Sequence, residues 1–315
     1  MDIEEIAELI RSMKIRGAGE IARTAAQALK DLAISYNGND IDQFRSLIQK
    51  GKDILLSTRP TAVSLWNAVH SVLKNVKNFD SVDELKSLIT KNADNFISKS
   101  REAVRIIGEI GAKRINSGDC ILTHCNSKAA LSAIKTAYAQ GKKLEVIATE
   151  SRPWRQGLLT VRELAGHQIP TTLIIDSAVR WAMKKVDLVI VGADTVASNG
   201  AVINKIGTSQ IALIAEEARV PFVVCAETYK FSPRTLLGEL VEIEERDANE
   251  IVNRDEIPEN VKVLNPVFDA TPPEYIDSIV TEIGLVPPYA AYEIIVRELG
   301  EEFMFEKGGE WNGIF

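Results

Sequence analysis

Residues 120–130 read CILTHCNSKAA, an apolar run that ends at the thiol of Cys125, with a helix-forming sequence directly behind it. A cysteine in this position lies over the positive end of the helix dipole, and Lys128 is close by. Both features favour the thiolate and can lower the pKa of a thiol from about 8.5 to roughly 3.5–7.5. The stretch therefore predicts a strand, a turn with a reactive thiol, and a helix.

The chain beyond Gly118 repeats this pattern, with short apolar runs that alternate with helical segments. The runs are residues 120–124, 144–149, 171–176, 188–192 and 221–225. The helical segments between them include residues 127–140, 158–165, 178–184 and 209–218. Strands that alternate with helices of this length predict an α/β fold with a parallel, doubly wound sheet and helices on both faces.

The sequence pattern in the first third of the chain indicates helices and no strands. Ile21, Ala25 and Leu29 form one of several apolar stripes at helical spacing, and Asp40 is a suitable N-cap for a following helix. A long amphipathic segment then leads to a stop at residues 116–119. We therefore predict a helical N-terminal domain with a connecting helix over residues 1–117, and an α/β catalytic domain over 118–315.

The composition excludes several classes of function. A net charge of −7 argues against a nucleic-acid partner, because phosphate contacts need clustered Lys and Arg. No apolar run approaches the roughly 18 residues that span a bilayer, so we expect no membrane partner. The N-terminal sequence MDIEE lacks the regions of a signal peptide, and three cysteines suit a reducing compartment, so we expect a cytoplasmic protein. With only three histidines beside these cysteines, we expect no metal site.

A carboxyl group follows a later strand in the same way as the thiol. Residues 189–194 read VIVGAD, which places Asp194 at the carboxyl end of its strand. In an open parallel sheet, ligands bind at that edge. Cys125 and Asp194 on one edge suggest proton transfer on a small molecule; the alternative is a buried thiol and a helix-capping aspartate.

Residues 16–22 read RGAGEIA and superficially match a dinucleotide-binding fingerprint. That interpretation fails because the fingerprint must follow a strand, whereas here a helix precedes it. A Gly-rich turn into a helix, with an arginine beside it, is still a suitable phosphate site. The alternative is a plain helix–helix turn with an exposed arginine. Arg59, in a turn before Pro60, is a weaker candidate of the same kind.

Further polar residues follow the other predicted strands. Arg152 and Gln156, in the stretch ESRPWRQG, should lie on the same edge as Cys125. Asn204 and Lys205 belong to a polar loop after the Asp194 strand, and Lys230 follows the strand that ends at residue 225. We expect Cys120 and Cys225 to be structural, His124 to pack or hydrogen-bond rather than act as a base, and Trp154 to be a surface or interface residue.

In order along the chain, these motifs resemble one superfamily. It joins the regulatory subunits of translation initiation factor 2B, methylthioribose-1-phosphate isomerase and archaeal ribose-1,5-bisphosphate isomerase. The matching motifs are RG at 16–17, THCN at 123–126, ESRP at 150–153 with QG at 156–157, GAD at 192–194, NG at 199–200 and NKIG at 204–207. The resemblance covers residues 10–299 and implies a helical domain on a Rossmann-like domain; the tail after Gly300 lies outside it.

Four stretches indicate a branch of this superfamily. The chain has RGAG at 16–19 and SKAA at 127–130, where methylthioribose-1-phosphate isomerases typically have RGAPAIG and a glycine soon after the Cys-Asn pair. Together with FDATPPEY at 268–275 and PPYAA at 287–291, these stretches resemble ribose-1,5-bisphosphate isomerase. The regulatory subunits generally do not keep the cysteine and the aspartate together, whereas this chain has both.

The resemblance implies conversion of α-D-ribose 1,5-bisphosphate to D-ribulose 1,5-bisphosphate. Phosphate on the anomeric oxygen locks the sugar ring, so an acid must protonate the ring oxygen while a base removes the proton at C2. The resemblance assigns the acid to Asp194 and the base to Cys125, through a phosphoenolate, with no metal or redox cofactor. Asp194 must therefore be protonated, and Cys125 deprotonated, when the reaction begins.

The same resemblance implies binding residues and partners. The candidates for the two phosphates and the sugar are Arg16, Gly17, Ala18, Gly19, Arg59, Asn126, Ser127, Lys128, Arg152, Gln156, Asn204, Lys205 and Lys230. It also implies nucleotide salvage, activation by AMP, and homo-oligomers from dimers to hexamers. Two alternatives stay open: a non-catalytic regulatory subunit of initiation factor 2B, and a methylthioribose-1-phosphate isomerase.

Overall fold

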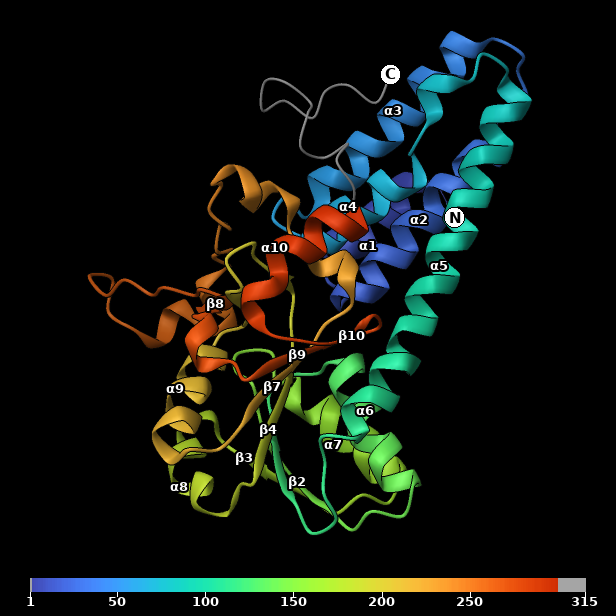
Figure 1. The fold of residues 1–315 in the computed structure, drawn as a ribbon. Coiled ribbons are helices and arrows are strands. Elements are labelled where there is room, and N and C mark those ends of the chain that lie inside the picture. The colour runs from blue at the N-terminus through green and yellow to red at the C-terminus, as the bar shows by residue number, and fades with distance from the viewer. Residues whose placement is uncertain (1, 300–315) are drawn as a thin grey trace. The chain divides into compact units, whose positions relative to one another are not determined.

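The computed structural model describes residues 2–299, which divide into two compact units. The first unit runs to Glu102 and the second is Ala103–Glu298. The division falls inside the long helix α5, Val82–Ala112 (Figure 1). Within the described residues, no helix is long and apolar enough to cross a membrane.

The first unit is helical, as the sequence predicts. Its other helices are α1 (Ile3–Arg11), α2 (Ala18–Ser35), α3 (Ile41–Thr58) and α4 (Val63–Val72). The predicted N-cap is confirmed, because Asp40 Oδ1 accepts hydrogen bonds from the backbone N–H groups of Asp42 and Gln43 at 2.9 and 3.0 Å. Small buried residues such as Ala22 and Ala26 let α2 pack closely against α4.

The second unit is built on a seven-stranded sheet with the order β10-β9-β7-β4-β1-β2-β3. Its strands are β1 (Cys120–Thr123), β2 (Glu145–Thr149), β3 (Thr171–Ile174), β4 (Leu188–Gly192), β7 (Phe222–Cys225), β9 (Ser278–Thr281) and β10 (Gly284–Val286). All neighbours pair in parallel except β10, which is antiparallel to β9. The central strands are buried at every position, as expected of a parallel sheet covered on both faces.

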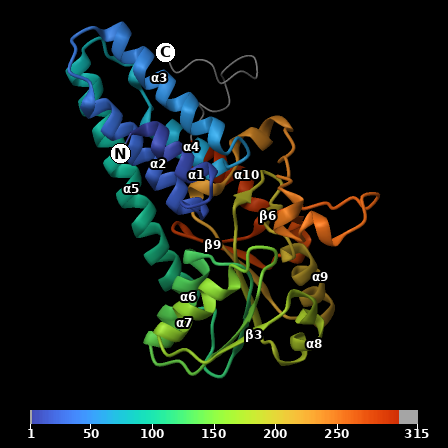
Figure 2. The same ribbon diagram turned by 180° about the vertical axis from the view of Figure 1, so that it is seen from behind.

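The connections confirm the doubly wound topology. Figures 1 and 2 show α6 (Lys128–Ala139) and α7 (Gly157–Gly166) on one side of the sheet, and α8 (Val179–Ala182) and α9 (Thr208–Ala218) on the other. The chain passes from β1 outward to β2 and β3, then returns to β4 on the other side of β1. The strand order therefore reverses between β1 and β4, which is where such sheets bind ligands.

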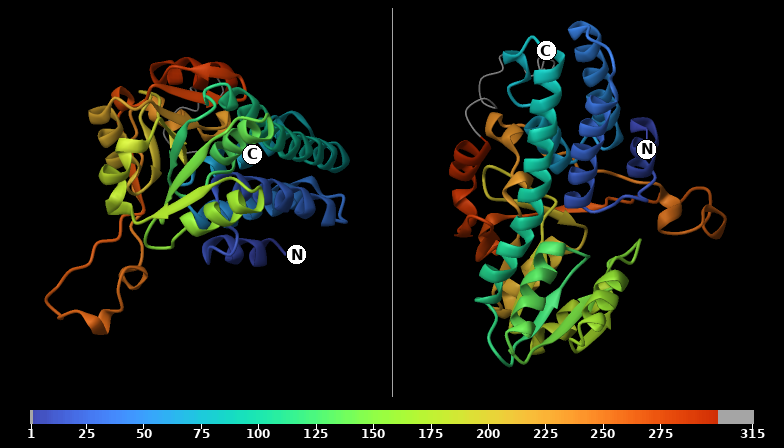
Figure 3. Two further views of the ribbon diagram at one scale, coloured as in Figure 1. Left: turned by 90° about the horizontal axis from the view of Figure 1, so that it is seen from below. Right: turned by 90° about the vertical axis from the view of Figure 1, so that its right-hand side faces the viewer.

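A smaller antiparallel sheet lies beside this edge, and the sequence did not predict it. Its strands are β5 (Thr195–Val196), β6 (Val202–Lys205) and β8 (Phe268–Thr271). Part of the predicted polar loop is thus strand β6, whose four residues are all buried. The segment between β7 and β8 is largely irregular, and its orange part extends away from the sheet in Figure 3.

Short turns complete the described chain. The 3-10 turns are Val76–Asn78, Asp176–Ala178, Met183–Lys185, Thr228–Lys230, Pro233–Leu237, Ala248–Glu250, Arg254–Glu256, Pro273–Tyr275 and Pro288–Ala290. A short helix α10 (Ala291–Ile294) is followed by a π-helical turn, Ile295–Leu299.

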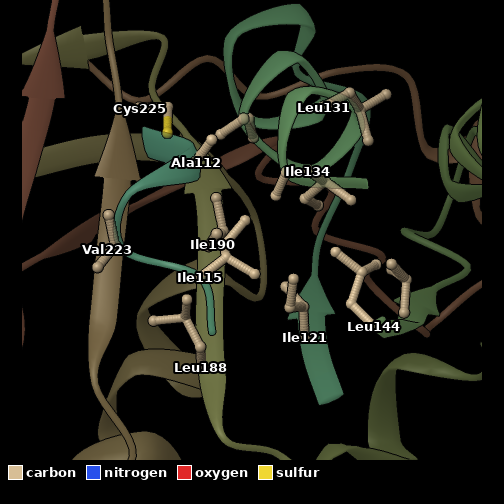
Figure 4. Close-up of a cluster of buried hydrophobic side chains, with 14 of the residues drawn as sticks. Ala112, Ile115, Ile121, Leu131, Ile134, Leu144, Leu188, Ile190, Val223 and Cys225 are labelled. Atoms are coloured by element: carbon tan, nitrogen blue, oxygen red, sulfur yellow. The ribbon is translucent and has the colours of Figure 1, made fainter. Parts of the chain in front are cut away.

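An apolar core fills the space between the sheet and α6 (Figure 4). Ile121 and Ile190 of the strands and Leu131 and Ile134 of the helix belong to this buried cluster. Cys225 lies in this cluster with none of its surface exposed, so the prediction that it is a core residue is confirmed. This core fixes β1 and β4, the two strands that end at the candidate site.

Candidate active site

Cys125 lies in the turn between β1 and α6 with its backbone in the left-handed region, at φ +66°. Few residues with a side chain adopt this conformation, and it needs support from its surroundings. Two hydroxyls supply that support: Ser151 Oγ accepts a hydrogen bond from the Cys125 N–H at 2.8 Å, and Thr160 Oγ1 donates to the Cys125 carbonyl at 2.6 Å. Asn126 Nδ2 also donates to Thr160 Oγ1, at 3.0 Å. The loop after β2 and helix α7 therefore hold this turn together.

The end of β4 lies directly against the start of α6. Ser127 caps α6 by accepting a hydrogen bond from the Ala130 N–H at 3.3 Å. A Cβ atom at Gly192 would overlap Ser127 Oγ, so only glycine permits this approach. Asp194 follows two residues later, and its backbone N–H donates to the Ile203 carbonyl at 2.9 Å. The packing of Gly192 on Ser127 thus brings the carboxyl and the thiol to one edge.

The electrostatic environment of Cys125 differs from the expectation. Burial, with a contribution from Asp194, raises the pKa of the Cys125 thiol to about 11. The cation that opposes this rise is Lys205. Lys128 instead forms an ion pair with Glu163 at 2.7 Å in an exposed position. The prediction of a low pKa for this thiol is therefore wrong, because burial raises the pKa.

Lys205 is a buried cation on β6. Its ammonium group lies 4.8 Å from the centre of the Phe268 ring, and the residue is 8% exposed. Lys205 forms no ion pair with any residue that the structure describes. The neighbouring Asn204 donates from Nδ2 to Thr208 Oγ1 at 3.0 Å, at the start of α9. A buried ammonium group without a carboxylate partner is suited to bind an anion.

Asp269, on the adjacent strand β8, is a polar residue of this region that sequence reasoning missed. Its carboxylate accepts hydrogen bonds from the backbone N–H groups of Gly207 at 2.8 Å and Ser209 at 3.2 Å. Burial raises the pKa of Asp269 to about 6, against the effect of these bonds and of Lys205. A single aspartate beside apolar and small residues in a short strand was the available signal.

The loop after β2 carries Arg152 and Gln156. Asp176, just after β3, accepts hydrogen bonds from the backbone N–H groups of Ser151 and Arg152, both at 2.8 Å. The Arg152 guanidinium group donates to the Ile251 carbonyl at 2.9 Å. Gln156 Oε1 is buried and accepts no hydrogen bond from the described residues. Asp176 was also missed, although an aspartate at the end of a predicted strand was a usable signal.

Lys230 lies at the carboxyl end of β7, near the same edge. It forms a buried ion pair with Glu227 at 2.7 Å. Burial alone would raise the pKa of Glu227, but the ammonium group of Lys230 holds this pKa below its usual range. Its role in phosphate binding stays a prediction, because Glu227 already offsets part of its charge.

The remaining candidates belong to the first unit. Gly17 begins α2 from the left-handed region, at φ +88°, with Arg16 exposed before it and Ala18 and Gly19 in the first turn. Arg59 follows α3 and donates to the Met13 sulfur at 3.0 Å. A helix does precede the RGAG turn, as predicted. The part of these residues in substrate binding stays a prediction.

The edge of the second unit therefore carries a thiol, a carboxyl group and a buried ammonium group at the point where the strand order reverses. Within residues 2–299, no group of His, Cys, Asp and Glu side chains is arranged to hold a metal ion. Such a site can exchange protons with a small anionic molecule.

Comparison with known proteins places these features in a wider group. Residues 14–288 match the family described as the Initiation factor 2 subunit family. A ribose 1,5-bisphosphate isomerase of Archaeoglobus fulgidus is 54% identical over 299 residues, 95% of this chain and 94% of that protein. A protein of the same name from Methanocaldococcus jannaschii is 50% identical over 298 residues, which are 95% of this chain and 96% of that protein. The structure of 5-methylthioribose 1-phosphate isomerase from Pyrococcus horikoshii aligns with a TM-score of 0.78 at 31% identity, covering 95% of this chain and 88% of that one.

Proposed function

The chain belongs to the initiation factor 2 subunit family, and on that premise we propose that it isomerises α-D-ribose 1,5-bisphosphate to D-ribulose 1,5-bisphosphate. The observation that carries this proposal is the pair Cys125 and Asp194 at the ends of β1 and β4, where the strand order reverses. Two proteins named for this reaction are 54% and 50% identical to the chain over nearly its whole length.

The residues of the edge suit the chemistry of a locked ring. Asp194 donates a proton to the ring oxygen while the Cys125 thiolate removes the proton at C2. The bond between C1 and the ring oxygen breaks, and C1 and C2 become an enol that keeps its phosphate. Asp194 then takes the proton from the C2 hydroxyl, and the Cys125 thiol returns its proton to C1. Both groups regain their starting states, and each step of this kind contributes roughly 10²–10⁴-fold.

The active form requires the thiolate, although burial raises the pKa of the Cys125 thiol to about 11. Lys205 is the cation that favours the thiolate, and the N-terminus of α6 acts in the same direction. A thiolate of such a raised pKa is a strong base once formed, which suits removal of a proton from carbon.

Positively charged side chains and helix N-termini near this edge of the large sheet are suited to bind the two phosphates of the substrate. From the second unit we assign Asn126, Ser127, Lys128, Arg152, Gln156, Asn204, Lys205 and Lys230 to the substrate. Arg16, Gly17, Ala18, Gly19 and Arg59, in the first unit, are proposed phosphate ligands on the strength of the sequence resemblance alone. Among the described residues none donates a hydrogen bond to Gln156 Oε1, which suits a sugar hydroxyl as the donor.

We also propose the physiological setting that the resemblance implies, namely a cytoplasmic homo-oligomer, a dimer or a hexamer, that acts in nucleotide salvage of AMP-derived ribose and is activated by AMP. The three cysteines, an odd number without a paired framework, suit a reducing compartment and support the location. No metal or redox cofactor enters the proposed steps.

Turnover of two substrates tests the proposal against its main rival. The similarity to the Pyrococcus horikoshii structure favours methylthioribose 1-phosphate as the second candidate substrate. Phosphorus NMR of each sugar phosphate with the enzyme, with and without AMP, separates the two. We expect consumption of ribose 1,5-bisphosphate with formation of ribulose 1,5-bisphosphate. Turnover of methylthioribose 1-phosphate instead would reassign the enzyme, and turnover of neither would favour a regulatory subunit.

A further inference from the structure

His124 lies at the junction of three chain segments beside the candidate base. Strand β1 ends before it, and the residue is 1% exposed. Its Nδ1 atom is 2.6 Å from Thr149 Oγ1, at the end of β2, and its Nε2 atom is 2.9 Å from the Ile206 carbonyl oxygen, between β6 and α9. The ring therefore joins two loops that come from opposite sides of the strand-order reversal.

These partners define the form of the ring. A carbonyl oxygen only accepts hydrogen bonds, so Nε2 carries the proton that it donates to Ile206. Nδ1 is then the acceptor in a neutral ring, and the Thr149 hydroxyl donates to it. Burial lowers the pKa of His124, and Lys205 acts in the same direction against Asp176. His124 is thus a neutral ring with both nitrogens already in use.

Both loops carry groups of the proposed reaction. Ser151 Oγ, which accepts the hydrogen bond from the Cys125 N–H, lies 3.3 Å from His124 Nδ1. On the other side, Ile206 directly follows Lys205, and a Cβ atom at Gly207 would lie 3.3 Å from His124 Cε1. One ring therefore contacts the support of the Cys125 turn and the segment that holds the ammonium group of Lys205.

We propose that His124 is a positioning residue for the isomerisation, and that its neutral ring sets the placement of Cys125 relative to Lys205. It does so by linking the Thr149–Ser151 segment to the Ile206–Gly207 segment. It exchanges no proton with the substrate. Loss of the link moves Lys205 away from the sulfur, and displacements of about 1 Å cost on the order of 10²-fold in rate.

A double-variant cycle separates positioning from proton transfer. His124→Gln keeps a donor for Ile206 but loses Nδ1, which accepts the hydrogen bond of the Thr149 hydroxyl. Thr149→Val removes that hydroxyl with little change of shape and keeps the imidazole ring. We expect kcat to fall about 10-fold or more in His124→Gln, by a similar factor in Thr149→Val, and no further in the double variant, because each change breaks the same link. A proton-transfer role predicts that Thr149→Val, which keeps the ring, stays near the wild type, and that result would overturn the proposal.

A second readout needs no turnover, because the kinetic test rests on the proposed isomerase function. The rate at which iodoacetamide alkylates Cys125, measured by mass spectrometry of its peptide, reports the thiolate that Lys205 favours. We expect this rate to fall several-fold in His124→Gln and to a similar level in the double variant. His167→Gln, the same change at an exposed histidine, is the matched control and should leave the rate unchanged.

The outcomes are distinguishable. Wild-type protein that turns over no sugar phosphate contradicts the isomerase, while the alkylation series still decides the placement of Cys125. The positioning role would be contradicted if His124→Gln is folded, with a thermal midpoint close to that of the wild type, and is alkylated at the wild-type rate. If His124→Gln does not fold, Thr149→Val alone removes the donor to Nδ1 and should slow alkylation in the same direction.

Discussion

At the scale of single residues, the environment of Cys125 controls the chemistry. Its backbone is held in the left-handed region by Ser151 and Thr160, and the residue is half-buried, in the electrostatic field of Asp194 and Lys205. Burial and the carboxylate disfavour the thiolate, whereas the ammonium group favours it. The thiol is therefore protonated in the resting chain, with one nearby cation to assist its ionisation.

The first prediction concerns the reactivity of this thiol. Because burial raises the pKa of Cys125 to about 11, alkylation by iodoacetamide should be slow at pH 7 and accelerate steadily as the pH rises toward 10. Lys205→Met should slow it at every pH, since the variant loses the cation that lowers the pKa. Lys128→Met, which removes a lysine paired with Glu163, should have a much smaller effect. A rate that is already maximal at pH 7 would contradict this assignment.

The second prediction concerns the pH dependence of stability. The pKa of Asp269 is about 6 in the folded chain, above the ordinary value of 3.8. Between these values the folded state binds more protons than the unfolded state, so stability falls as the pH rises through this window. The fall from this group amounts to at most about 3 kcal/mol. Asp269→Asn keeps an oxygen acceptor for the Gly207 N–H but cannot titrate, so the denaturation midpoint of this variant should depend less on pH between pH 4 and 6 than that of the wild type. The same pH dependence in both proteins would contradict the raised pKa of Asp269.

Sequence reasoning at this scale located Cys125 and Asp194 because the carboxyl end of a strand is a local signal. It misjudged the effect of Lys128 on the Cys125 thiol, because the ion pair with Glu163 joins α6 to α7 and depends on tertiary packing. It missed Asp176 and Asp269 for a related reason. Each carboxylate accepts hydrogen bonds from backbone N–H groups of a loop distant in sequence, and single-sequence patterns do not show which loops meet.

At the scale of elements, helix starts are fitted tightly against strand ends. Gly157 begins α7, and a Cβ atom there would overlap the Thr149 carbonyl oxygen and lie 2.9 Å from Glu150 Cα. Both obstacles are backbone atoms, which cannot move without shifting β2. The arrangement keeps Thr160, one turn further along α7, in place to hold the Cys125 carbonyl.

The third prediction follows from this fit. Gly157→Ala should lower the free energy of unfolding by about 2 kcal/mol or more, because overpacking against backbone cannot be relieved. Gly166→Ala, at the other end of the same helix, meets nothing within 4 Å and should be neutral or slightly stabilising. Denaturant midpoints of the two variants give the comparison. Equal midpoints would show that α7 can move away from β2.

Strands β1, β2, β3, β4 and β7 of the large sheet were predicted because each is a short apolar run between turn signals, whereas β9 and β10 were not predicted. Predicted bounds differ by one to a few residues; β1, for example, ends at Thr123 because Cys125 turns left-handed. The small sheet was not predictable from the same rules. Strand β6 contains Asn204 and Lys205, which suggest a loop, and it is buried only because β8 pairs with it from some 60 residues away.

At the scale of the whole molecule, some surface residues are more apolar than a monomer in water requires. Trp181 is 70% exposed, Tyr289 66% and Leu240 95%. These residues are candidate contacts between copies of the chain in the homo-oligomer proposed above. The fourth prediction is that light scattering coupled to size exclusion gives a mass that is a multiple of 34.7 kDa, at least a dimer. A monomer at micromolar concentration would contradict the proposed homo-oligomer.

The central claim is that Cys125 and Asp194 form one acid–base pair acting on ribose 1,5-bisphosphate. The most direct measurement is turnover of that sugar by the wild type, Cys125→Ser and Asp194→Asn, with Cys120→Ser as a control thiol at the opposite end of β1. We predict that both site variants fold and lose on the order of 10²–10⁴-fold or more in kcat, while Cys120→Ser stays near the wild type. A folded site variant that keeps wild-type turnover would contradict the account.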